Sequence, residues 1–383
     1  MMNFHRAGSL QSPLDLPVLL GHFVPWYALD AAAYPFPDEW AKDIDYRPPV
    51  ENMRHWCDAR AGYRRTHLHW PEIGVYDSRQ PQAIEWQIRA ALEHGVQGFI
   101  VNWYGKNSVE NLITLHWLKG LNDWNAAHPG QPFCYFISFD SQAQWPSEGK
   151  RPVTMEEDFR YIKDHLITDA YLCRDGRPIF SVFPYEDNCA QWRRAMNSVF
   201  GAEGADLIWM NGTPRQGETA AFPWVRPDDA ALSHEGFYPW KDPDNAGDDF
   251  LRSFYERCNE AQGRLDYIMG GVWPGFDDQL VSWAWNATPE NPSVRPRVIC
   301  RETSRGNTLE LTWKALLDYL RQWADGNPQA AIPCPLIQIV TWNDYAEAST
   351  VEPTKDYGCK PLEICQANLQ TARRIWAEAK NKL

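Results

Sequence analysis

Short apolar runs alternate along the chain with longer stretches in which apolar residues recur every three or four positions. Runs of about four to eight apolar residues between turn-forming residues are typical of buried strands, and the longer periodic stretches are typical of helices. The first strand is predicted over residues 18–27 and the first helix over 81–94, with a long loop between them. Further strands are predicted over residues 96–103, 133–139, 178–183, 206–210, 230–238, 265–272 and 336–340. Further helices are predicted over residues 108–127, 155–167, 189–199, 248–262, 309–324 and 362–380.

The order of these elements predicts a closed barrel. Eight strands that alternate with helices are typical of a (β/α)8 TIM barrel, whereas an open doubly wound sheet usually has a glycine-rich phosphate-binding turn after its first strand. No such turn follows residues 18–27. We therefore expect an α/β fold in which residues 1–383 form a single (β/α)8 catalytic domain with long loops after the strands. The unit that contains the fifth strand, 206–210, is the least regular, because a proline-rich stretch follows it.

Most of the predicted strands end in aromatic and polar residues. The active site of a TIM barrel is built at the carboxyl ends of the strands, so these residues are expected to converge on one pocket. Aromatic faces stack on sugar rings, and acids and amides bind sugar hydroxyls, so we expect a glycan ligand. The expected substrate-binding residues are Trp26, Tyr27, Asn102, Trp103, Asp140, Glu235, Tyr238, Trp273, Trp342 and Asn343. For Asp140, capping of the segment that follows it is an equally good interpretation. Among the other polar residues, His22 is expected in the core or at the rim, and Asp277 and Asp278 are expected in a solvated turn.

Asp344 and Glu347 stand three residues apart directly after the apolar run 335–340. Glycoside cleavage needs two carboxyl groups, one to protonate the leaving oxygen and one to act as base or nucleophile. We expect these two acids to be the catalytic pair, with Glu347 protonated beside aromatic neighbours such as Trp342 and Tyr345, and Asp344 ionised. The alternative is a loop whose solvated acids cap a helix.

Composition narrows the class of ligand. The 383 residues, 44% of them hydrophobic, can bury a large core. A net charge of -13, without a cluster of basic residues, argues against nucleic acid, anionic membranes and polyanionic substrates. Twenty Trp and sixteen Tyr suit stacking on sugars, although many must also fill the core. No apolar stretch approaches the roughly 18 residues of a membrane helix, and nothing in the sequence specifies an oligomeric state.

Metal and cofactor sites are not expected. The nine cysteines form no C-x-x-C pair, and there is no H-E-x-x-H motif. These features predict reduced thiols, no metal and no cofactor, and they favour the cytoplasm. The alternative is a secreted enzyme from which a leader peptide has been removed.

Two stretches resemble known glycoside hydrolases. Residues 74–88 and 95–105 resemble the family 99-like proteins, the endo-α-mannosidase group, and residues 25–27 fit the same group. Residues 22–23 and 342–347 are more similar to family 71, the fungal α-1,3-glucanases. The resemblance covers the first hundred residues and the eighth strand well, and the middle of the chain poorly. It adds Tyr76 and Asp77 to the residues expected to bind substrate.

This resemblance implies a (β/α)8 barrel that hydrolyses α-linked glycans without a cofactor. The family 99 motif Asn-Glu-Trp-x-Glu-Gly carries two catalytic glutamates, which fall on Asp344 and Glu347. The first implied role is that of a base toward the sugar 2-hydroxyl, and the second is that of general acid. Asp344 is shorter than the family 99 glutamate and matches the family 71 pattern, which leaves room for a water and slightly favours an inverting reaction.

Two other functions fit the same residues. A degenerate barrel can bind carbohydrate without catalysis. A polysaccharide lyase that acts on uronic acids would need a basic pocket for the substrate carboxylate, and Arg79, Arg301 and Arg305 are the candidate cations.

Overall fold

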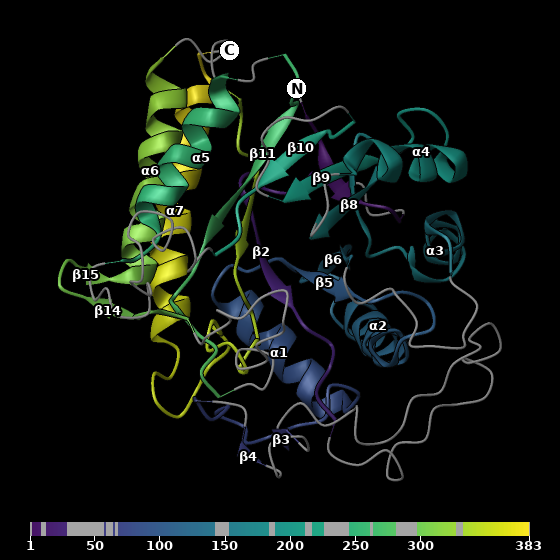
Figure 1. Ribbon diagram of the computed structural model, residues 1–383, viewed down its shortest axis with the longest axis horizontal. Helices are drawn as coiled ribbons and strands as arrows, with labels where there is room; N and C mark the ends of the chain where they lie inside the picture. The colour runs from purple at the N-terminus through teal and green to yellow at the C-terminus, as the bar shows by residue number, and fades with distance from the viewer. Residues whose placement is uncertain are drawn as a thin grey trace, which may run out of the picture.

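The computed structural model contains a closed barrel of eight parallel strands with helices between them (Figure 1). It describes residues 2–8, 13–28, 57–58, 64–65, 68–141, 153–183, 188–210, 217–225, 245–260, 263–280, 297–326 and 332–382. In chain order the barrel strands are β2 (Val18–Phe23), β5 (Gly98–Trp103), β6 (Cys134–Asp140), β8 (Arg177–Phe183), β9 (Asp206–Met210), β10 (Ala220–Phe222), β11 (Tyr267–Val272) and β16 (Leu336–Ile339). Each strand pairs in parallel with the next, and the pairing of β16 with β2 closes the barrel. The predicted (β/α)8 fold is confirmed.

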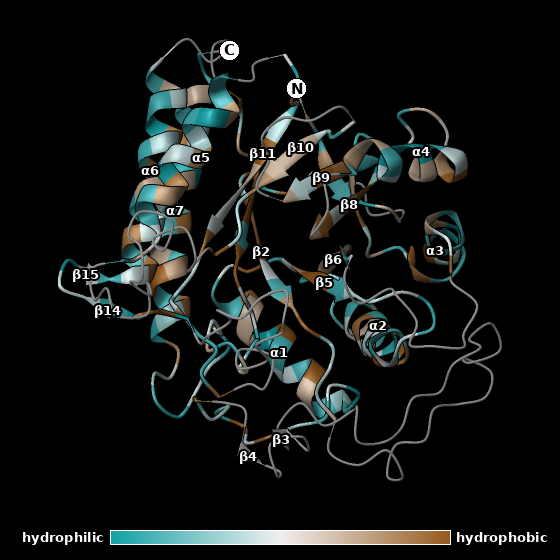
Figure 2. Ribbon diagram, viewed as in Figure 1, coloured by the Kyte–Doolittle hydropathy of each residue, from teal (hydrophilic) through white to brown (hydrophobic). Residues whose placement is uncertain are grey.

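Helices surround the barrel. They are α1 (Pro81–Glu93), α2 (Val109–Ala127), α3 (Met155–Tyr161) continued by the π-helix η3 (Ile162–Leu166), α4 (Cys189–Phe200), α5 (Asp248–Glu260), α6 (Thr308–Asp325) and α7 (Lys360–Lys380). On one flank, α6 packs against both α5 and α7 (Figure 1). Apolar residues concentrate on the barrel strands and on the inner faces of the helices (Figure 2). None of the helices in the described part of the chain has the length and apolar character that a membrane crossing needs.

Short strands complete the molecule. The strands β1 (Phe4–Arg6) and β7 (Leu172–Arg174) extend the barrel sheet through antiparallel pairing at β8. Three two-stranded pairs are separate from it: β3 (Cys57–Asp58) with β4 (Arg64–Arg65), β12 (Phe276–Asp277) with β13 (Val298–Ile299), and β14 (Glu302–Thr303) with β15 (Gly306–Asn307).

Several helices begin where polar side chains bind free backbone N–H groups. Ser108 accepts a hydrogen bond from the backbone of Asn111 at the start of α2. Thr154 and Glu157 form a reciprocal capping box at the start of α3. These caps explain why the observed helix boundaries lie close to the predicted ones.

The sixth strand differs from the prediction. It was expected over residues 230–238, but β10 (Ala220–Phe222) occupies this position between β9 and β11. Three residues, two of them alanines, are too few to produce a recognisable apolar period. The segment 230–238, with the expected site residues Glu235 and Tyr238, lies outside the described residues.

Candidate active site

The acidic pair lies in a closed loop at the carboxyl end of β16. We call residues 341–352 the eighth-strand loop. Its ends are held together by backbone hydrogen bonds from Thr341 N–H to Ser349 O at 2.9 Å and from Glu352 N–H to Trp342 O at 2.8 Å. The hydroxyl groups of Thr341 and Ser349 also hydrogen-bond at 3.1 Å. A loop closed at its base in this way holds the two acids in a defined position relative to the barrel.

Asp344 and Glu347 face each other inside this loop. The backbone N–H of Asp344 donates to Thr341 Oγ1 at 2.8 Å, and the backbone N–H of Glu347 donates to Asp344 Oδ1 at 3.0 Å. The two carboxyl groups also act on each other electrostatically. Asp344 therefore caps the turn that contains Glu347, but it is buried, whereas the alternative interpretation expected solvated acids that cap a helix.

Burial gives the two acids different affinities for a proton. It raises the pKa of Asp344 to about 6, and hydrogen bonds from Glu347 and Ala346 oppose the rise. Burial raises the pKa of Glu347 well above its usual range, and the negative charge of Asp344 raises it further. Near neutral pH the pair therefore holds one shared proton, mainly on Glu347. These are the protonation states that acid catalysis by Glu347 and base catalysis by Asp344 require.

A third carboxylate acts on the pair from the loop after β11. Asp278 is fully buried and forms an ion pair with Arg297, with hydrogen bonds from Nη2 at 2.9 Å and Nε at 3.0 Å. The charge of Asp278 raises the pKa of both acids in the pair, while Arg297 lowers that of Glu347. The neighbouring Asp277 donates its N–H to Glu347 O at 2.7 Å, which joins β12 to the eighth-strand loop. The expectation of a solvated turn is therefore wrong for Asp278.

Asn343 connects the eighth-strand loop to the end of the first strand. Val24 N–H donates to Asn343 Oδ1 at 2.8 Å, and Asn343 Nδ2 donates to Val24 O at 3.1 Å. Tyr345 N–H donates to the Tyr27 hydroxyl at 3.0 Å. Asn343 and Tyr27 are fully buried, so both side chains hold the loop in place instead of offering a group to substrate. This corrects the expectation that they bind sugar.

The side chains of Tyr76 and Asp77 also bind other buried side chains of the protein. The Tyr76 hydroxyl donates to Glu352 Oε2 at 2.8 Å. Asp77 is fully buried and accepts from Arg79 Nε at 2.8 Å, and Arg79 is buried with it. The expectation that these two residues contact substrate is therefore corrected to a structural role.

Three of the four tryptophans expected to stack on sugars belong to the core. The indole N–H of Trp103 donates to Asn111 Oδ1 at 2.9 Å, and that of Trp273 donates to Ala246 O at 2.9 Å. The indole N–H of Trp342 donates to Glu352 Oε1 at 3.0 Å. All three side chains are fully buried and leave no ring face for a ligand. Strand-end position cannot distinguish such residues from stacking platforms, because an indole with a protein acceptor packs well in a core.

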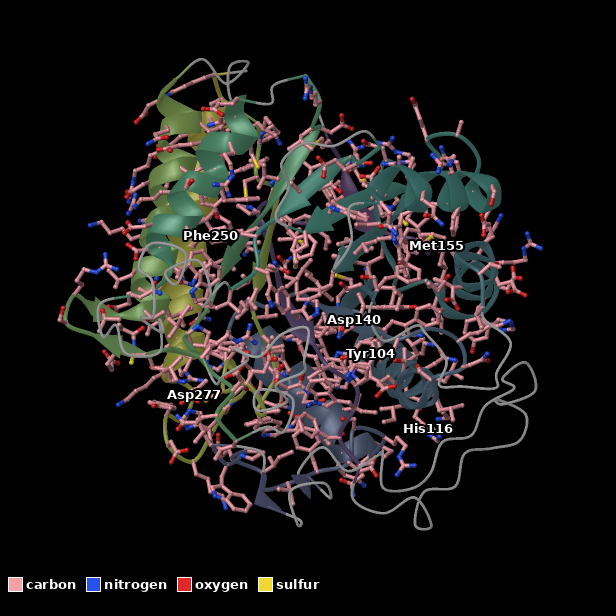
Figure 3. All side chains as sticks on the ribbon, in the orientation of Figure 1. Tyr104, His116, Asp140, Met155, Phe250 and Asp277 are labelled. Carbon is pink, nitrogen blue, oxygen red and sulfur yellow. The ribbon has the colours of Figure 1, made fainter. Side chains whose placement is uncertain are left out.

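Trp26 remains as a candidate stacking residue, with 9% of its surface exposed. Its ring lies 6.4 Å from that of Tyr104, which is partly exposed at the end of β5. Asp140 is partly exposed at the end of the neighbouring strand β6, and Figure 3 shows Tyr104 and Asp140 near each other. Burial raises the pKa of Glu110, which the sequence did not single out, to about 7, and the charge of Asp140 raises it further. Trp26, Tyr104 and Asp140 therefore remain candidates for contact with substrate.

Polar side chains also occupy the barrel interior near its carboxyl end. His22 lies 3.3 Å from Asn102 Oδ1, and Asn102 Nδ2 donates to the Tyr104 hydroxyl at 2.8 Å. Burial lowers the pKa of His22 to about 4, so the imidazole is neutral at pH 7. The prediction that His22 is a core residue is confirmed. Asn102 connects this interior to the partly exposed Tyr104.

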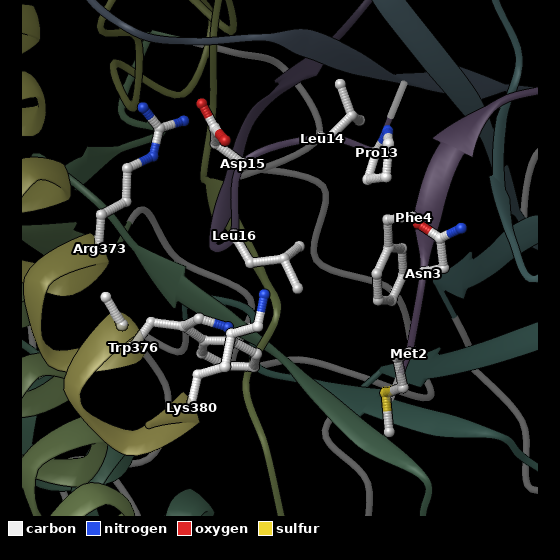
Figure 4. A pocket seen from close by; sticks show the side chains of 11 residues that line it. Met2, Asn3, Phe4, Pro13, Leu14, Asp15, Leu16, Arg373, Trp376 and Lys380 are labelled. Atoms are coloured by element: carbon white, nitrogen blue, oxygen red, sulfur yellow. The ribbon is translucent and has the colours of Figure 1, made fainter. Parts of the chain in front are cut away.

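A separate cavity of about 590 Å³ lies between the residues that precede β2 and the C-terminal part of α7 (Figure 4). Phe4, Leu14, Leu16 and Trp376 line it together with Lys380. It contains neither member of the acidic pair, so it is not the candidate active site. Among the residues that the structure describes, no cluster of three or more His, Cys, Asp or Glu side chains is arranged to hold a metal ion.

Solved structures of glycoside hydrolases share this architecture. The GH99 endo-α-mannosidase from Bacteroides thetaiotaomicron in complex with bis-tris-propane has a TM-score of 0.58 at 18% identity, over 94% of this chain and 98% of that chain. Another structure of that enzyme has a TM-score of 0.56 at 16% identity, with 94% and 98% coverage. A glycoside hydrolase-like protein matches with a TM-score of 0.55 at 13% identity, over 94% and 97% of the two chains. No protein-family model and no curated protein matches the sequence. The chain thus has the fold of the GH99 endo-α-mannosidase over almost its whole length, which confirms the family 99-like resemblance at the level of fold.

Proposed function

We propose that this protein is a glycoside hydrolase, a single catalytic barrel that cleaves α-linked glycans with Glu347 as general acid and Asp344 as base. The observation that carries the proposal is the pair formed by buried Asp344 and partly buried Glu347, with unequal proton affinities, in one loop at the carboxyl end of a TIM barrel. The fold shared with an endo-α-mannosidase supports it. No residue outside the pair is needed to exchange a proton with the substrate.

The proximity of Asp344 and Glu347 in the eighth-strand loop supports a retaining reaction. Inverting glycosidases separate their carboxyls by roughly 6.5–9.5 Å, with a water between the base and the sugar. Asp344 and Glu347 belong to one short loop in which Glu347 N–H donates to Asp344 Oδ1 at 3.0 Å, and this proximity favours the shorter separation of retaining enzymes. The slight preference for inversion, which followed from the short Asp344 side chain, is therefore withdrawn.

In the reaction route implied by the family 99 resemblance, Asp344 and Glu347 account for every proton that is transferred. Glu347 gives its proton to the glycosidic oxygen as the C1–O bond breaks, and Asp344 takes the proton of the 2-hydroxyl, whose oxygen bonds to C1. Water then opens the resulting 1,2-anhydro sugar at C1, Glu347 accepts a proton from that water, and Asp344 returns its proton to O2. Two displacements at C1 retain the configuration.

Attack by the 2-hydroxyl restricts the substrate. The hydroxyl oxygen must approach C1 from the face opposite the leaving group, so O1 and O2 must be trans on the ring. An α-mannoside has this arrangement, and an α-glucoside does not. We therefore propose α-mannose-containing glycans as the substrate, in preference to α-1,3-glucans.

The three arginines that the lyase alternative would need have other partners. Arg79 pairs with Asp77, and Arg305 pairs with Asp248 at 2.6 Å. Arg301 donates to Ala348 O at 2.9 Å and to Thr350 O at 2.7 Å. These contacts favour hydrolysis over elimination from a uronic acid.

Mass spectrometry of products from a panel of glycans tests the proposed function. The panel contains an α-mannan, an α-1,3-glucan and a polyuronate, each incubated with the wild type and with Glu347→Gln. We expect one water added per bond cleaved in the α-mannan, and loss of this activity in the variant. Unsaturated products would instead establish a lyase, and specific binding without cleavage would establish a carbohydrate-binding barrel.

A further inference from the structure

Glu352 is a buried acid at the base of the eighth-strand loop. It lies five residues beyond Glu347 in the sequence, and only 1% of its surface is exposed. Its carboxylate is not hydrogen-bonded to either member of the reacting pair. A buried acid that takes no part in the proposed reaction needs another explanation.

Four neutral donors surround the Glu352 carboxylate. Oε2 accepts from the Tyr345 hydroxyl at 2.7 Å and from the Tyr76 hydroxyl at 2.8 Å. Oε1 accepts from Gln87 Nε2 at 2.6 Å and from Trp342 Nε1 at 3.0 Å. The four acceptor positions of a carboxylate are therefore filled. No Lys or Arg of the described chain forms a salt bridge with it, so hydrogen bonds alone stabilise the buried group.

The four donors come from three parts of the fold. Gln87 lies on α1, Tyr76 precedes that helix, and Trp342 and Tyr345 belong to the eighth-strand loop. One carboxylate therefore joins this loop to the structure that follows the first barrel strand. Removing it would leave four buried donors without their common acceptor, and each unsatisfied group carries a desolvation cost.

Two of these donors flank Asp344 in the sequence. Trp342 is two residues before it, and Tyr345 follows it directly. The side chains of both are bonded to Glu352, and the backbone N–H of Glu352 donates to Trp342 O at 2.8 Å. The chain on either side of the proposed base is thereby tied to a single buried group.

We infer that Glu352 is a positioning residue that holds Asp344 and Glu347 in their reactive arrangement through Trp342 and Tyr345. This inference rests on the proposed function, because it assigns the pair a reaction to be positioned for. Glu352 touches no reacting atom and acts through the loop. Displacement of catalytic groups by about 1 Å can cost on the order of a hundredfold in rate, so the loss is expected mainly in kcat.

Glu352→Gln is the informative variant because it preserves the shape of the side chain. The amide oxygen can accept from Gln87 and Trp342, and the amide nitrogen then faces the hydroxyls of Tyr76 and Tyr345. A hydroxyl can reverse its role and accept, so the variant is able to fold. Burial raises the pKa of Glu352 to about 7, so above this pH the two hydroxyls lose a charged acceptor in the variant, and charge-assisted bonds are roughly twice as strong as neutral ones.

The test compares kcat, KM and the melting temperature of the wild type and Glu352→Gln on an α-mannan oligosaccharide. Glu363→Gln is the matched control, since Glu363 is exposed in the first turn of α7. For Glu352→Gln we expect kcat to fall by about 10- to 100-fold with KM changed by less than about threefold, and for the control no change in either. A wild-type kcat in a folded Glu352→Gln protein, or a loss confined to KM, would overturn the inference.

Two further measurements test the positioning role if Glu352→Gln does not fold or if the wild type cleaves no glycan. If Glu352→Gln does not fold, Tyr345→Phe is the second variant, because it removes one of the four hydrogen bonds to Glu352. It should lower kcat by a smaller factor and leave KM nearly unchanged. If the wild type cleaves no glycan, the proposed function fails, and crystal structures of wild type and Glu352→Gln still test the positioning role. Displaced Asp344 and Glu347 carboxyls would then support that role, and an unchanged eighth-strand loop would overturn it.

Discussion

The backbone N–H of Glu347 donates to the side chain of Asp344 at 3.0 Å. A spacing of three residues in a tight turn allows this contact and brings the two acids close together. Their proximity separates their proton affinities, because the charge of Asp344 raises the pKa of Glu347. The spacing in the sequence thus explains how two acids of one loop can take different chemical roles.

Replacement of the general acid should affect substrates according to their leaving groups. Glu347→Gln cannot protonate the glycosidic oxygen, so kcat on a natural glycan should fall by about 10²- to 10⁴-fold. An aryl α-glycoside, whose phenolate leaves without protonation, should lose much less. Steady-state rates on the two substrates measure the difference, and equal losses on both would remove Glu347 from the role of acid.

The pH dependence of kcat/KM should reflect the ionisation of Asp344 and Glu347. Asp344 must be ionised to act as base, so kcat/KM should rise with pH through about 6. The activity should fall again at higher pH, where Glu347 loses its proton. Arg297 lowers the pKa of Glu347, so Arg297→Gln should move the alkaline limb to higher pH. A profile whose alkaline limb is unchanged in this variant would contradict the assigned electrostatics.

The burial of Asp344 should cost stability above pH 6. Its pKa is raised from 3.8 to about 6 in the folded state, so the folded protein binds this proton more tightly than the unfolded chain does. The free energy of unfolding should therefore decrease as pH rises from about 4 to 6 and stay lower beyond that. Asp344→Asn avoids this loss and should be more stable than the wild type at pH 7, by about 1–3 kcal/mol, with no advantage at pH 4. Denaturant unfolding at the two pH values measures it, and an equal effect at both would argue against a raised pKa.

Substitution of Trp26 and Trp273 should differ in its effect on KM. Trp26→Ala should raise KM by up to about tenfold by removing a stacking face, and it should also lower the melting temperature because the side chain is largely buried. Trp273→Phe leaves Ala246 O without its donor and opens space in the core, so it should destabilise the protein by about 2–4 kcal/mol with KM unchanged. Calorimetry combined with steady-state kinetics separates the two effects. A KM increase for Trp273→Phe alone would return that residue to the binding site.

Local patterns predicted most of the fold. Seven of the eight barrel strands lie where apolar runs predicted them, because each run is long enough to show its period. The exception is β10 (Ala220–Phe222), whose three residues carry too little signal. The barrel itself followed from the alternation of strands and helices, which does not depend on any one element.

The candidate site was only partly predictable. Asp344 and Glu347 were found because their relation is local and visible in the sequence. The pairing of Asp278 with Arg297 spans 19 residues, and that of Glu352 with Gln87 spans 265, so neither had a local signal. The tryptophans at strand ends were overassigned to the ligand, since the sequence does not show which indoles find acceptors in the core.

Proton NMR of the anomeric region during cleavage of an α-linked mannose oligosaccharide tests the central claim most directly. The wild type should release an α-anomer first, which then equilibrates with the β-anomer, and Glu347→Gln should release neither at a comparable rate. Absence of cleavage by the wild type, first release of the β-anomer, or undiminished cleavage by Glu347→Gln would contradict catalysis by the Asp344–Glu347 pair as proposed.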